Sequence, residues 1–143
     1  MSQNPPSAWI PIHGGIAAPS GFQASGIKAG LKPSGKNDLA LVLAPEGASA
    51  AGIFTQSSVR AASVGLCQER LESNSARAVL INSGQANAFT GDRELLDSLL
   101  ATKTLANLLS LSEQEVLICS TGVIGQPIPI QKMINGLPSL VEA

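Results

Sequence analysis

The segment Val116-Leu117-Ile118-Cys119-Ser120-Thr121-Gly122-Val123-Ile124-Gly125 decides how this chain is organised. Its apolar first part, residues 116–119, predicts a short buried strand, and the small residues from Ser120 to Gly125 predict a turn at the end of that strand. The prolines of residues 126–129 then force the chain away. Such a turn lets backbone N–H groups and a hydroxyl point into open space. We therefore take this segment as a candidate for stabilising an oxyanion.

An earlier segment has the same arrangement. Residues 78–81 predict a short buried strand that ends at the loop NSGQANAFTG, residues 82–91. A helix is predicted over residues 92–110, because apolar side chains recur there at intervals of three and four. We expect Thr90 or Asp92 to cap this helix, and its wide leucine stripe predicts burial along much of its girth. In the second unit a helix is predicted from residue 128 to 134, with Gly136 and Pro138 interrupting it.

The first half of the chain predicts strands and an irregular lead-in. Residues 1–12 are expected to be poorly ordered. Strands are predicted over residues 22–31 and 38–44, joined as a hairpin by a turn at residues 32–37, and a third strand is predicted over residues 48–55. Residues 64–67 are expected to be extended, followed by a short helix at residues 68–72. The hairpin lysines, at positions 28, 32 and 36, are interpreted as a solvated face rather than a phosphate site.

Length and composition favour one globular α/β (α+β) domain. A chain of 143 residues, with 44% hydrophobic and 13% charged residues, is long and apolar enough to form a core. Aromatic residues make up only 3%, so Leu, Ile, Val and Ala must build that core. The low charge also suggests that a partner covers part of the surface. The alternative is an ordinary α/β domain rich in small residues.

Several classes of function are disfavoured. The net charge is −1 and no basic patch is visible, so a nucleic-acid partner is not expected. No apolar run approaches the roughly 18 residues that span a bilayer, and the N-terminus lacks the pattern of a signal peptide. Cys67 and Cys119 are interpreted as reduced core thiols, and the single His13 cannot hold zinc alone. We expect a cytoplasmic protein with no metal and no resident cofactor.

The turn after residue 119 has one of the three parts that acyl transfer needs. Such a reaction requires a nucleophile, a proton carrier and donors aimed at the oxyanion. The hydroxyl of Thr121 and a backbone N–H at Gly122 are candidate donors. No Gly-x-Ser-x-Gly elbow or Cys/His pair supplies the other two parts. From the residues alone, a purely structural turn is the better interpretation. For the loop at 82–91, polar-ligand binding through Asn82, Ser83 and Asn87 and a structural turn are equally supported.

Five segments together resemble a known family in order and spacing. They are residues 15–22 (GIAAPSGF), 38–43 (DLALVL), 50–55 (AAGIFT), 77–91 (RAVLINSGQANAFTG) and 115–129 (EVLICSTGVIGQPIP). This set resembles the N-terminal α-chain region of the ornithine acetyltransferase family, also called arginine biosynthesis bifunctional glutamate N-acetyltransferases. The resemblance implies a layered sheet-and-helix sandwich of the N-terminal-nucleophile type.

The resemblance also implies a mechanism. In that family the precursor cuts itself at an Ala-Thr bond, and the freed threonine becomes the nucleophile. It carries acetyl from N2-acetylornithine to glutamate, and acetyl-CoA serves some members as a second donor. The α chain and the β chain from the same precursor form an α2β2 heterotetramer. The family's oxyanion hole corresponds to Thr121 and Gly122 in this sequence.

Two departures from the family pattern stand out. Gln85 and Phe89 occupy positions where the family usually has Asn and Cys. The family's cleavage motif, Asn-Met-Ala-Thr-Met-Leu, is absent from residues 1–143. We therefore expect a single partial domain that supplies the oxyanion hole, lacks the nucleophile and is inactive alone. The alternatives are a non-catalytic polar-ligand-binding or assembly module that uses the 82–91 loop, and a related N-terminal-nucleophile aminopeptidase.

Overall fold

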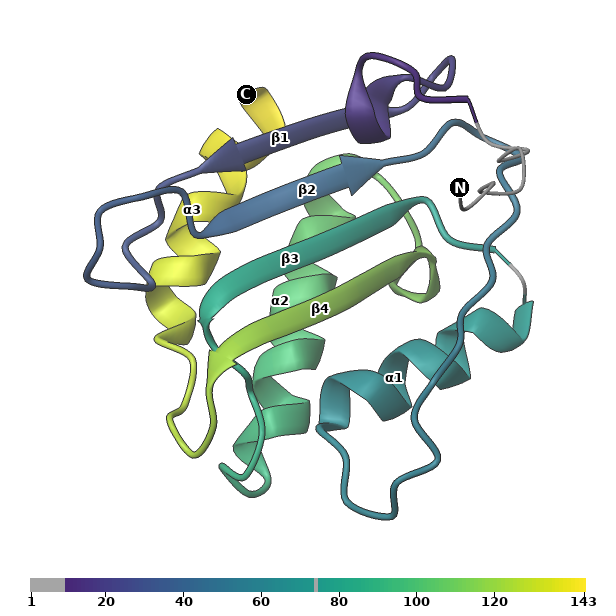
Figure 1. The fold of residues 1–143 in the computed structure, drawn as a ribbon. Helices are drawn as coiled ribbons and strands as arrows, with labels where there is room; N and C mark the ends of the chain where they lie inside the picture. Colours follow the sequence, from purple (N-terminus) through teal and green to yellow (C-terminus); the bar gives the residue numbers. More distant parts are fainter. Residues whose placement is uncertain (1–9, 74) are drawn as a thin grey trace, which may run out of the picture.

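The computed structural model describes residues 10–73 and 75–143, and most of the predicted lead-in, residues 1–9, lies outside them. Four strands form one sheet in the order β1 (Gln23–Ile27), β2 (Leu39–Leu43), β3 (Ala78–Gln85) and β4 (Val116–Val123) (Figure 1). The strand β2 is antiparallel to both β1 and β3, whereas β3 and β4 are parallel. The predicted hairpin and the two predicted buried strands are therefore confirmed. The predicted turn at residues 120–125 and the predicted start of the loop at residue 82 are wrong in part, because β4 continues to Val123 and β3 to Gln85, where the two strands still pair with each other.

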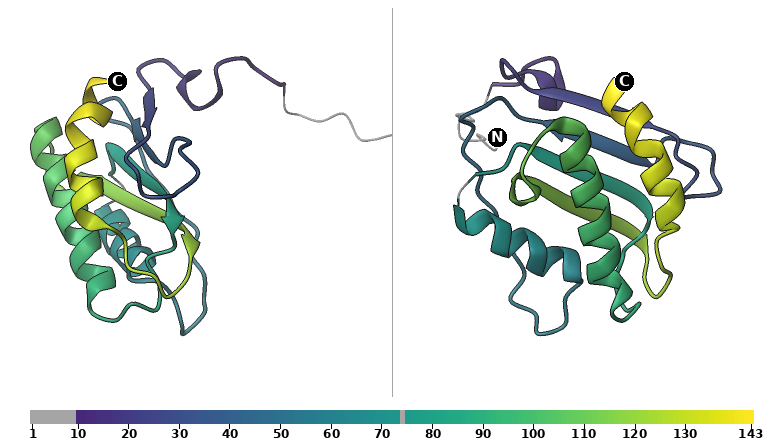
Figure 2. Two further views of the ribbon diagram at one scale, coloured as in Figure 1. Left: turned by 90° about the vertical axis from the view of Figure 1, so that its left-hand side faces the viewer. Right: turned by 180° about the vertical axis from the view of Figure 1, so that it is seen from behind.

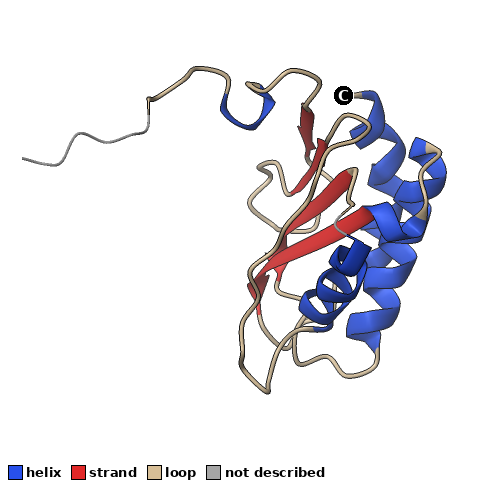
Figure 3. Cartoon of the chain, turned by 90° about the vertical axis from the view of Figure 1, so that its right-hand side faces the viewer, coloured by secondary structure: helices blue, strands red, loops and turns tan. Residues whose placement is uncertain are grey.

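Three helices cover one face of this sheet. They are α1 (Ala62–Arg70), α2 (Arg93–Leu109) and α3 (Ile130–Glu142), with short 3-10 turns at Gly15–Ala17, Leu71–Ser73 and Glu113–Glu115. Figures 2 and 3 show the helices together on one side of the strands. The core between the layers consists mainly of aliphatic side chains, with Cys67 and Met133 among them. Its largest members include Leu39, Leu80, Leu105, Val116, Ile118, Leu137 and Leu140. This is the mixed α/β architecture that the sequence predicts.

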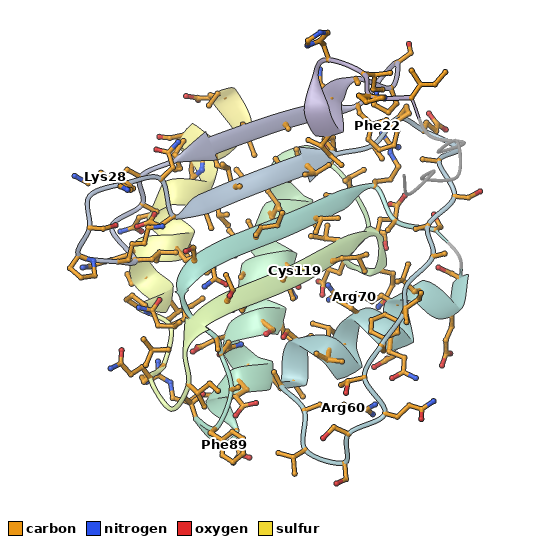
Figure 4. The ribbon with its side chains drawn as sticks, in the orientation of Figure 1. Phe22, Lys28, Arg60, Arg70, Phe89 and Cys119 are labelled. Atoms are coloured by element: carbon orange, nitrogen blue, oxygen red, sulfur yellow. The ribbon has the colours of Figure 1, made fainter. Side chains whose placement is uncertain are left out.

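The opposite face of the sheet carries no helix of the described residues. Because side chains alternate along a strand, this face presents Val42 from β2, Val79 and Ile81 from β3, and Leu117 and Cys119 from β4. The aliphatic members are half-buried and Cys119 is exposed. Figure 4 shows Cys119 on β4 in this view of the sheet. We call this surface the open sheet face, and it is apolar along its centre.

The helix α2 forms the crossover that joins parallel strands β3 and β4, as such a pair requires. Its observed span matches the predicted helix to within one residue at each end. The predicted caps are wrong, because Asp92 makes no side-chain capping bond. The carboxylate of Glu94 instead accepts hydrogen bonds from the backbone N–H of Thr90, at 2.8 Å, and from that of Ala62, at 3.2 Å.

The burial of α2 also differs from the prediction. Its buried residues are mostly small or polar: Asp97, Ser98, Ala101, Thr102, Leu105 and Ala106. Four of the predicted stripe leucines, Leu95, Leu96, Leu100 and Leu108, are exposed. Small side chains allow close packing, and Thr102 satisfies its hydroxyl by donating to the carbonyl of Ser98 at 2.9 Å. The predicted stripe is therefore right for Leu99, Leu105 and Leu109, which pack on the core, and too wide where it includes the exposed leucines.

Three other predictions of secondary structure are wrong. Residues 48–55, predicted as a third strand, are irregular apart from an isolated bridge that pairs Ser49 with Ser75. Residues 64–67 are helical, because they belong to α1. Gly136 and Pro138 do not interrupt α3, which runs on to Glu142. Its buried Met133, Leu137 and Leu140 hold the helix against the sheet despite the proline.

Candidate functional site

The carboxyl ends of β3 and β4 bring the two predicted loops together. Because these strands are parallel, both ends lie at the same edge of the sheet. Ser83 pairs with Thr121 in the register, and Gly84 pairs with Gly122. Thr121 and Gly122 are exposed, and Ser83 is half-buried. By strand alternation the side chains of Ser83 and Thr121 lie on the open sheet face. We define these four residues as the candidate site.

The two glycines are required by the close approach of the strands. Gly84 has φ +138° and Gly122 has φ +137°, in a region that L side chains rarely adopt. A Cβ on Gly122 would overlap the carbonyl group of Gly84, and a Cβ on Gly84 would lie 3.2 Å from the carbonyl oxygen of Leu31. The backbone at Gly122 is consequently exposed without any side chain of its own to shield it.

The asparagines of the 82–91 loop point inward. Asn82 and Asn87 are fully buried. The amide of Asn82 donates to the carbonyl of Gln85 at 3.0 Å, and that of Asn87 donates to the carbonyl of Glu94 and to Oγ of Ser98, both at 2.9 Å. Of the three residues predicted to bind a ligand, only Ser83 lies at the candidate site. In this structure the two asparagines fix the shape of the loop.

Lys32 also contacts the candidate site, and the sequence analysis missed it. Its ammonium Nζ donates to Oγ of Ser83 at 3.2 Å, and the residue is half-buried. Lys28 and Lys36 are exposed, as expected for a solvated face. Figure 1 shows that the β1–β2 loop, which carries Lys32, lies at the same end of the sheet as the carboxyl ends of β3 and β4. Only this long-range pairing distinguishes Lys32 from its neighbours in the sequence.

A buried carboxylate holds the loop of Lys32 in place. Asp38 is 3% exposed, and its carboxylate accepts hydrogen bonds from the backbone N–H groups of Ala29, at 2.7 Å, Leu31, at 2.7 Å, and Lys32, at 3.1 Å. Gln85 fixes the same loop from β3, because its amide donates to the carbonyl of Leu31 at 2.8 Å. The ammonium is therefore presented by an anchored turn and not by a free surface side chain.

The two cysteines differ in burial, and the prediction of a core thiol holds for Cys67 but not for Cys119. Cys67 is buried, and its Sγ is bonded to the backbone of Ile118, at 3.2 Å to the oxygen and 3.3 Å to the nitrogen. Burial raises the pKa of the Cys67 thiol, which makes it a poor nucleophile. Cys119 is not a core thiol, because it is exposed on the open sheet face. Both thiols are free.

The described residues hold neither a metal-type cluster nor a spanning helix. Across residues 10–73 and 75–143, no three side chains of the His, Cys, Asp or Glu type gather as a metal site would require. Within the same ranges, every helix is too short or too polar to cross a bilayer. The groups that are present at the candidate site are hydroxyl, backbone N–H and ammonium donors, which suit an oxygen that carries negative charge.

Comparison with known proteins gives a consistent result. A family model described as the ArgJ family matches residues 23–143. The arginine biosynthesis bifunctional proteins ArgJ of Prochlorococcus marinus (strain MIT 9313) and Parasynechococcus marenigrum (strain WH8102) are each 63% identical over 139 residues. Each match covers 96% of this chain, and 33% and 34% of the respective relative. The chain thus spans about a third of the length of these relatives.

Two solved structures share the fold. The ornithine acetyltransferase of Mycobacterium tuberculosis, solved in complex with ornithine, is 41% identical with a TM-score of 0.86, over 89% of this chain and 69% of that chain. The arginine biosynthesis bifunctional protein ArgJ of Bacillus halodurans is 34% identical with a TM-score of 0.82, over 87% of this chain and 65% of that chain. The sheet-and-helix layers described above are those of these proteins, as the sequence motifs predict.

Proposed function

Because the chain belongs to the ArgJ family, we propose that it provides the oxyanion-binding part of an enzyme that transfers acetyl from N2-acetylornithine to glutamate in arginine biosynthesis. The observation that carries this proposal is the exposure of Thr121 and Gly122 at the end of β4, beside Ser83 of β3. Two adjacent donors, a hydroxyl and an unshielded backbone N–H, match what a tetrahedral acyl intermediate requires.

The chemistry follows from what these donors can do. A threonine nucleophile from outside residues 1–143 attacks the acetyl carbonyl of N2-acetylornithine, and its own α-amino group takes the proton. The carbonyl oxygen becomes an oxyanion, which accepts hydrogen bonds from the Thr121 hydroxyl and the Gly122 N–H. Collapse of this intermediate breaks the C–N bond, and ornithine leaves with the proton. The acetyl group is then attached to the threonine oxygen.

The second half-reaction uses the same donors. The amine of glutamate attacks the acetyl-threonine ester, and the oxyanion forms again at Thr121 and Gly122. The threonine α-amino group takes a proton from the attacking nitrogen. Collapse then breaks the ester C–O bond, the threonine oxygen receives that proton, and N-acetylglutamate leaves. Losing one donor in such a site costs about 3 kcal/mol of transition-state stabilisation. Because both steps need the site, a defect there slows the whole cycle.

We also propose that the β chain of the same precursor packs against the open sheet face in an α2β2 assembly. Support comes from the apolar centre of that face and from the relatives, which are about three times as long as the matched segment. An apolar sheet surface that stays in water is unfavourable, by about 25 cal/mol for each Å² exposed. The residues that the relatives have beyond this segment are our candidates for the part that packs on the open sheet face. Because the proposed nucleophile lies outside residues 1–143, we expect the isolated 143-residue chain to be inactive.

A single substitution tests the proposed function. In a complete protein that contains this chain and the remaining two thirds of its relatives, acetyl transfer from N2-acetylornithine to glutamate is measured. Thr121→Ala should lower kcat by about 100-fold and leave the unfolding temperature nearly unchanged. Thr104→Ala, at a half-buried position of α2 whose hydroxyl donates only to the carbonyl of Leu100, is the matched control and should retain activity. Unchanged turnover in Thr121→Ala would remove Thr121 from the mechanism.

The same assay separates the alternatives. Acetyl transfer from acetyl-CoA to glutamate would show a bifunctional enzyme, and its absence a monofunctional one. Binding of N2-acetylornithine without any turnover would favour a non-catalytic binding module. Release of an amino-terminal residue from small peptides would favour the aminopeptidase. Acetyl transfer by the purified 143-residue chain alone would contradict our placement of the nucleophile outside it.

A further inference from the structure

Lys32 has an unusual environment for a lysine in a hairpin loop. Its backbone N–H is bonded to the carboxylate of Asp38, and its Nζ is bonded to Oγ of Ser83. Leu31, the preceding residue, is anchored by both Asp38 and Gln85. Lys32 also packs on the glycine pair, because a Cβ added at Gly84 would lie 3.4 Å from the Cβ of Lys32. The loop and the end of β3 thus form one unit.

The direction of the Lys32–Ser83 hydrogen bond is fixed by chemistry. An ammonium group can only donate, so Oγ of Ser83 must accept. The hydroxyl hydrogen of Ser83 then remains available for another acceptor. Thr121 is the register neighbour of Ser83 on β4 and lies on the same face of the sheet. Paired strands lie about 4.8 Å apart, so the two side chains lie side by side. Their hydroxyls are not hydrogen-bonded in this structure, and rotation about χ1 of either residue would bring them within reach.

This arrangement has a consequence for Thr121. If the Ser83 hydroxyl donates to Oγ1 of Thr121, the Thr121 hydrogen must point elsewhere, and the open sheet face is where an oxyanion would lie. Hydrogen bonds that all run in one direction polarise and strengthen one another. The positive charge of the Lys32 ammonium group, at the start of this series, would also stabilise the negative charge that develops on the oxyanion.

We propose that Lys32 is a positioning residue of the oxyanion site, which acts through Ser83 to hold the Thr121 hydroxyl in its donating orientation. This inference rests on the proposed function, because it assigns Lys32 to the same site. It differs from a role in which the ammonium group binds a substrate carboxylate directly. A positioning residue affects the transition state and hence kcat, whereas a carboxylate-binding lysine affects chiefly KM.

The experiment compares five variants in the complete protein: Lys32→Met, Lys32→Arg, Ser83→Ala, the Lys32→Met/Ser83→Ala double variant and Lys28→Met. Lys32→Met should lower kcat for acetyl transfer by about tenfold, with KM for both substrates within about twofold. Ser83→Ala should have a similar effect. The double variant should be no slower than either single variant, because both remove the same series of donors.

Two variants serve as controls. Lys28→Met removes a positive charge from the same loop, but Lys28 is exposed and should keep full activity. Lys32→Arg keeps the charge and should retain more activity than Lys32→Met. If Lys32→Met does not fold, as judged by thermal unfolding, Ser83→Ala still tests the series, because it leaves the loop backbone and its bonds to Asp38 intact.

Several results would overturn this inference. One is a raised KM at unchanged kcat in Lys32→Met, which would indicate carboxylate binding. Another is a double variant whose loss is the product of the two single losses, because Lys32 and Ser83 would then act independently. If Thr121→Ala impairs transfer but Lys32→Met and Ser83→Ala do not, only the role of Lys32 fails. If the unsubstituted complete protein transfers no acetyl group, the proposed function and this inference fail together.

Discussion

Gly122 lies so close to Gly84 that a Cβ on Gly122 would overlap the Gly84 carbonyl and lie 2.6 Å from the backbone nitrogen of Gln85. Both glycines also have positive φ. The backbones of β3 and β4 are therefore in direct contact at this register pair, the second from the end of the strands, next to the exposed Thr121. The contact between Gly122 and Gly84 holds the backbone of the candidate oxyanion site in place. Any side chain at Gly122 must push the two strands apart.

Gly122→Ala should consequently destabilise the chain by roughly 3 kcal/mol, because it combines an unfavourable φ with a backbone overlap. Gly125→Ala is the control, since Gly125 has φ +78° but open space around an added Cβ. It should cost about 1–2 kcal/mol, the φ penalty alone. Denaturation by urea measures both values. Equal losses in the two variants would show that the overlap is relieved at no cost.

Asp38→Asn should destabilise the chain by roughly 2 kcal/mol, because an amide replaces a charged acceptor of several backbone N–H groups in a buried turn. Asn37→Ala removes only an exposed bond to the carbonyl of Gly26 and should cost less than about 1 kcal/mol. Urea denaturation again provides the comparison. A loss for Asp38→Asn no larger than that for Asn37→Ala would mean that Asp38 does not hold the loop.

The sequence predicts the elements whose signals lie within one stretch of the chain. The apolar runs before residues 82 and 120 predict β3 and β4, and the three-to-four spacing predicts α2, because such signals lie within one element. A strand, by contrast, needs a partner. Residues 50–54 have the composition of a strand, yet no strand among the described residues pairs with them, and Ile53 is completely exposed.

Long-range contacts explain the rest. The bond between Lys32 and Ser83 joins residues 51 positions apart, so no local pattern marks it. The same holds for Gly136, where an added Cβ would lie 3.1 Å from the Cβ of Ala29 in the β1–β2 loop. Helix α3 therefore keeps a glycine that a local analysis interprets as a breaker. The positions of Thr121 and Gly122 follow from their sequence motif, whereas the contacts around them require the fold.

Alkylation of the cysteines should reveal whether the open sheet face is covered. In this chain alone, iodoacetamide should modify the exposed Cys119 and spare Cys67, which is buried and whose sulfur is hydrogen-bonded to the backbone of Ile118. In the complete protein Cys119 should become protected. Mass spectrometry identifies the modified peptide, and Cys119→Ser is the control. Equal modification of Cys119 in both proteins would contradict the packing that we propose for that face.

Asp97 should make the stability of the chain depend on pH. It is 7% exposed, and burial raises the pKa of its carboxyl group, while Arg93, at 3.6 Å, opposes that rise. A raised pKa means that the folded state binds its proton more tightly than the unfolded state. The contribution of Asp97 to the free energy of unfolding is then largest below the ordinary carboxyl pKa and falls as pH rises through the raised one.

Asp97→Asn should therefore be more stable than the parent chain at pH 7, by on the order of 1 kcal/mol, and the difference should vanish toward pH 3. Arg93→Ala should instead lower the free energy of unfolding at pH 7, because it removes the positive charge beside the buried carboxylate. The loss should be less than about 1 kcal/mol, because Arg93 is largely exposed. Urea denaturation across this pH range measures both. A parent chain that is more stable than Asp97→Asn at pH 7 would mean that the ion pair with Arg93 outweighs the cost of burying the carboxylate.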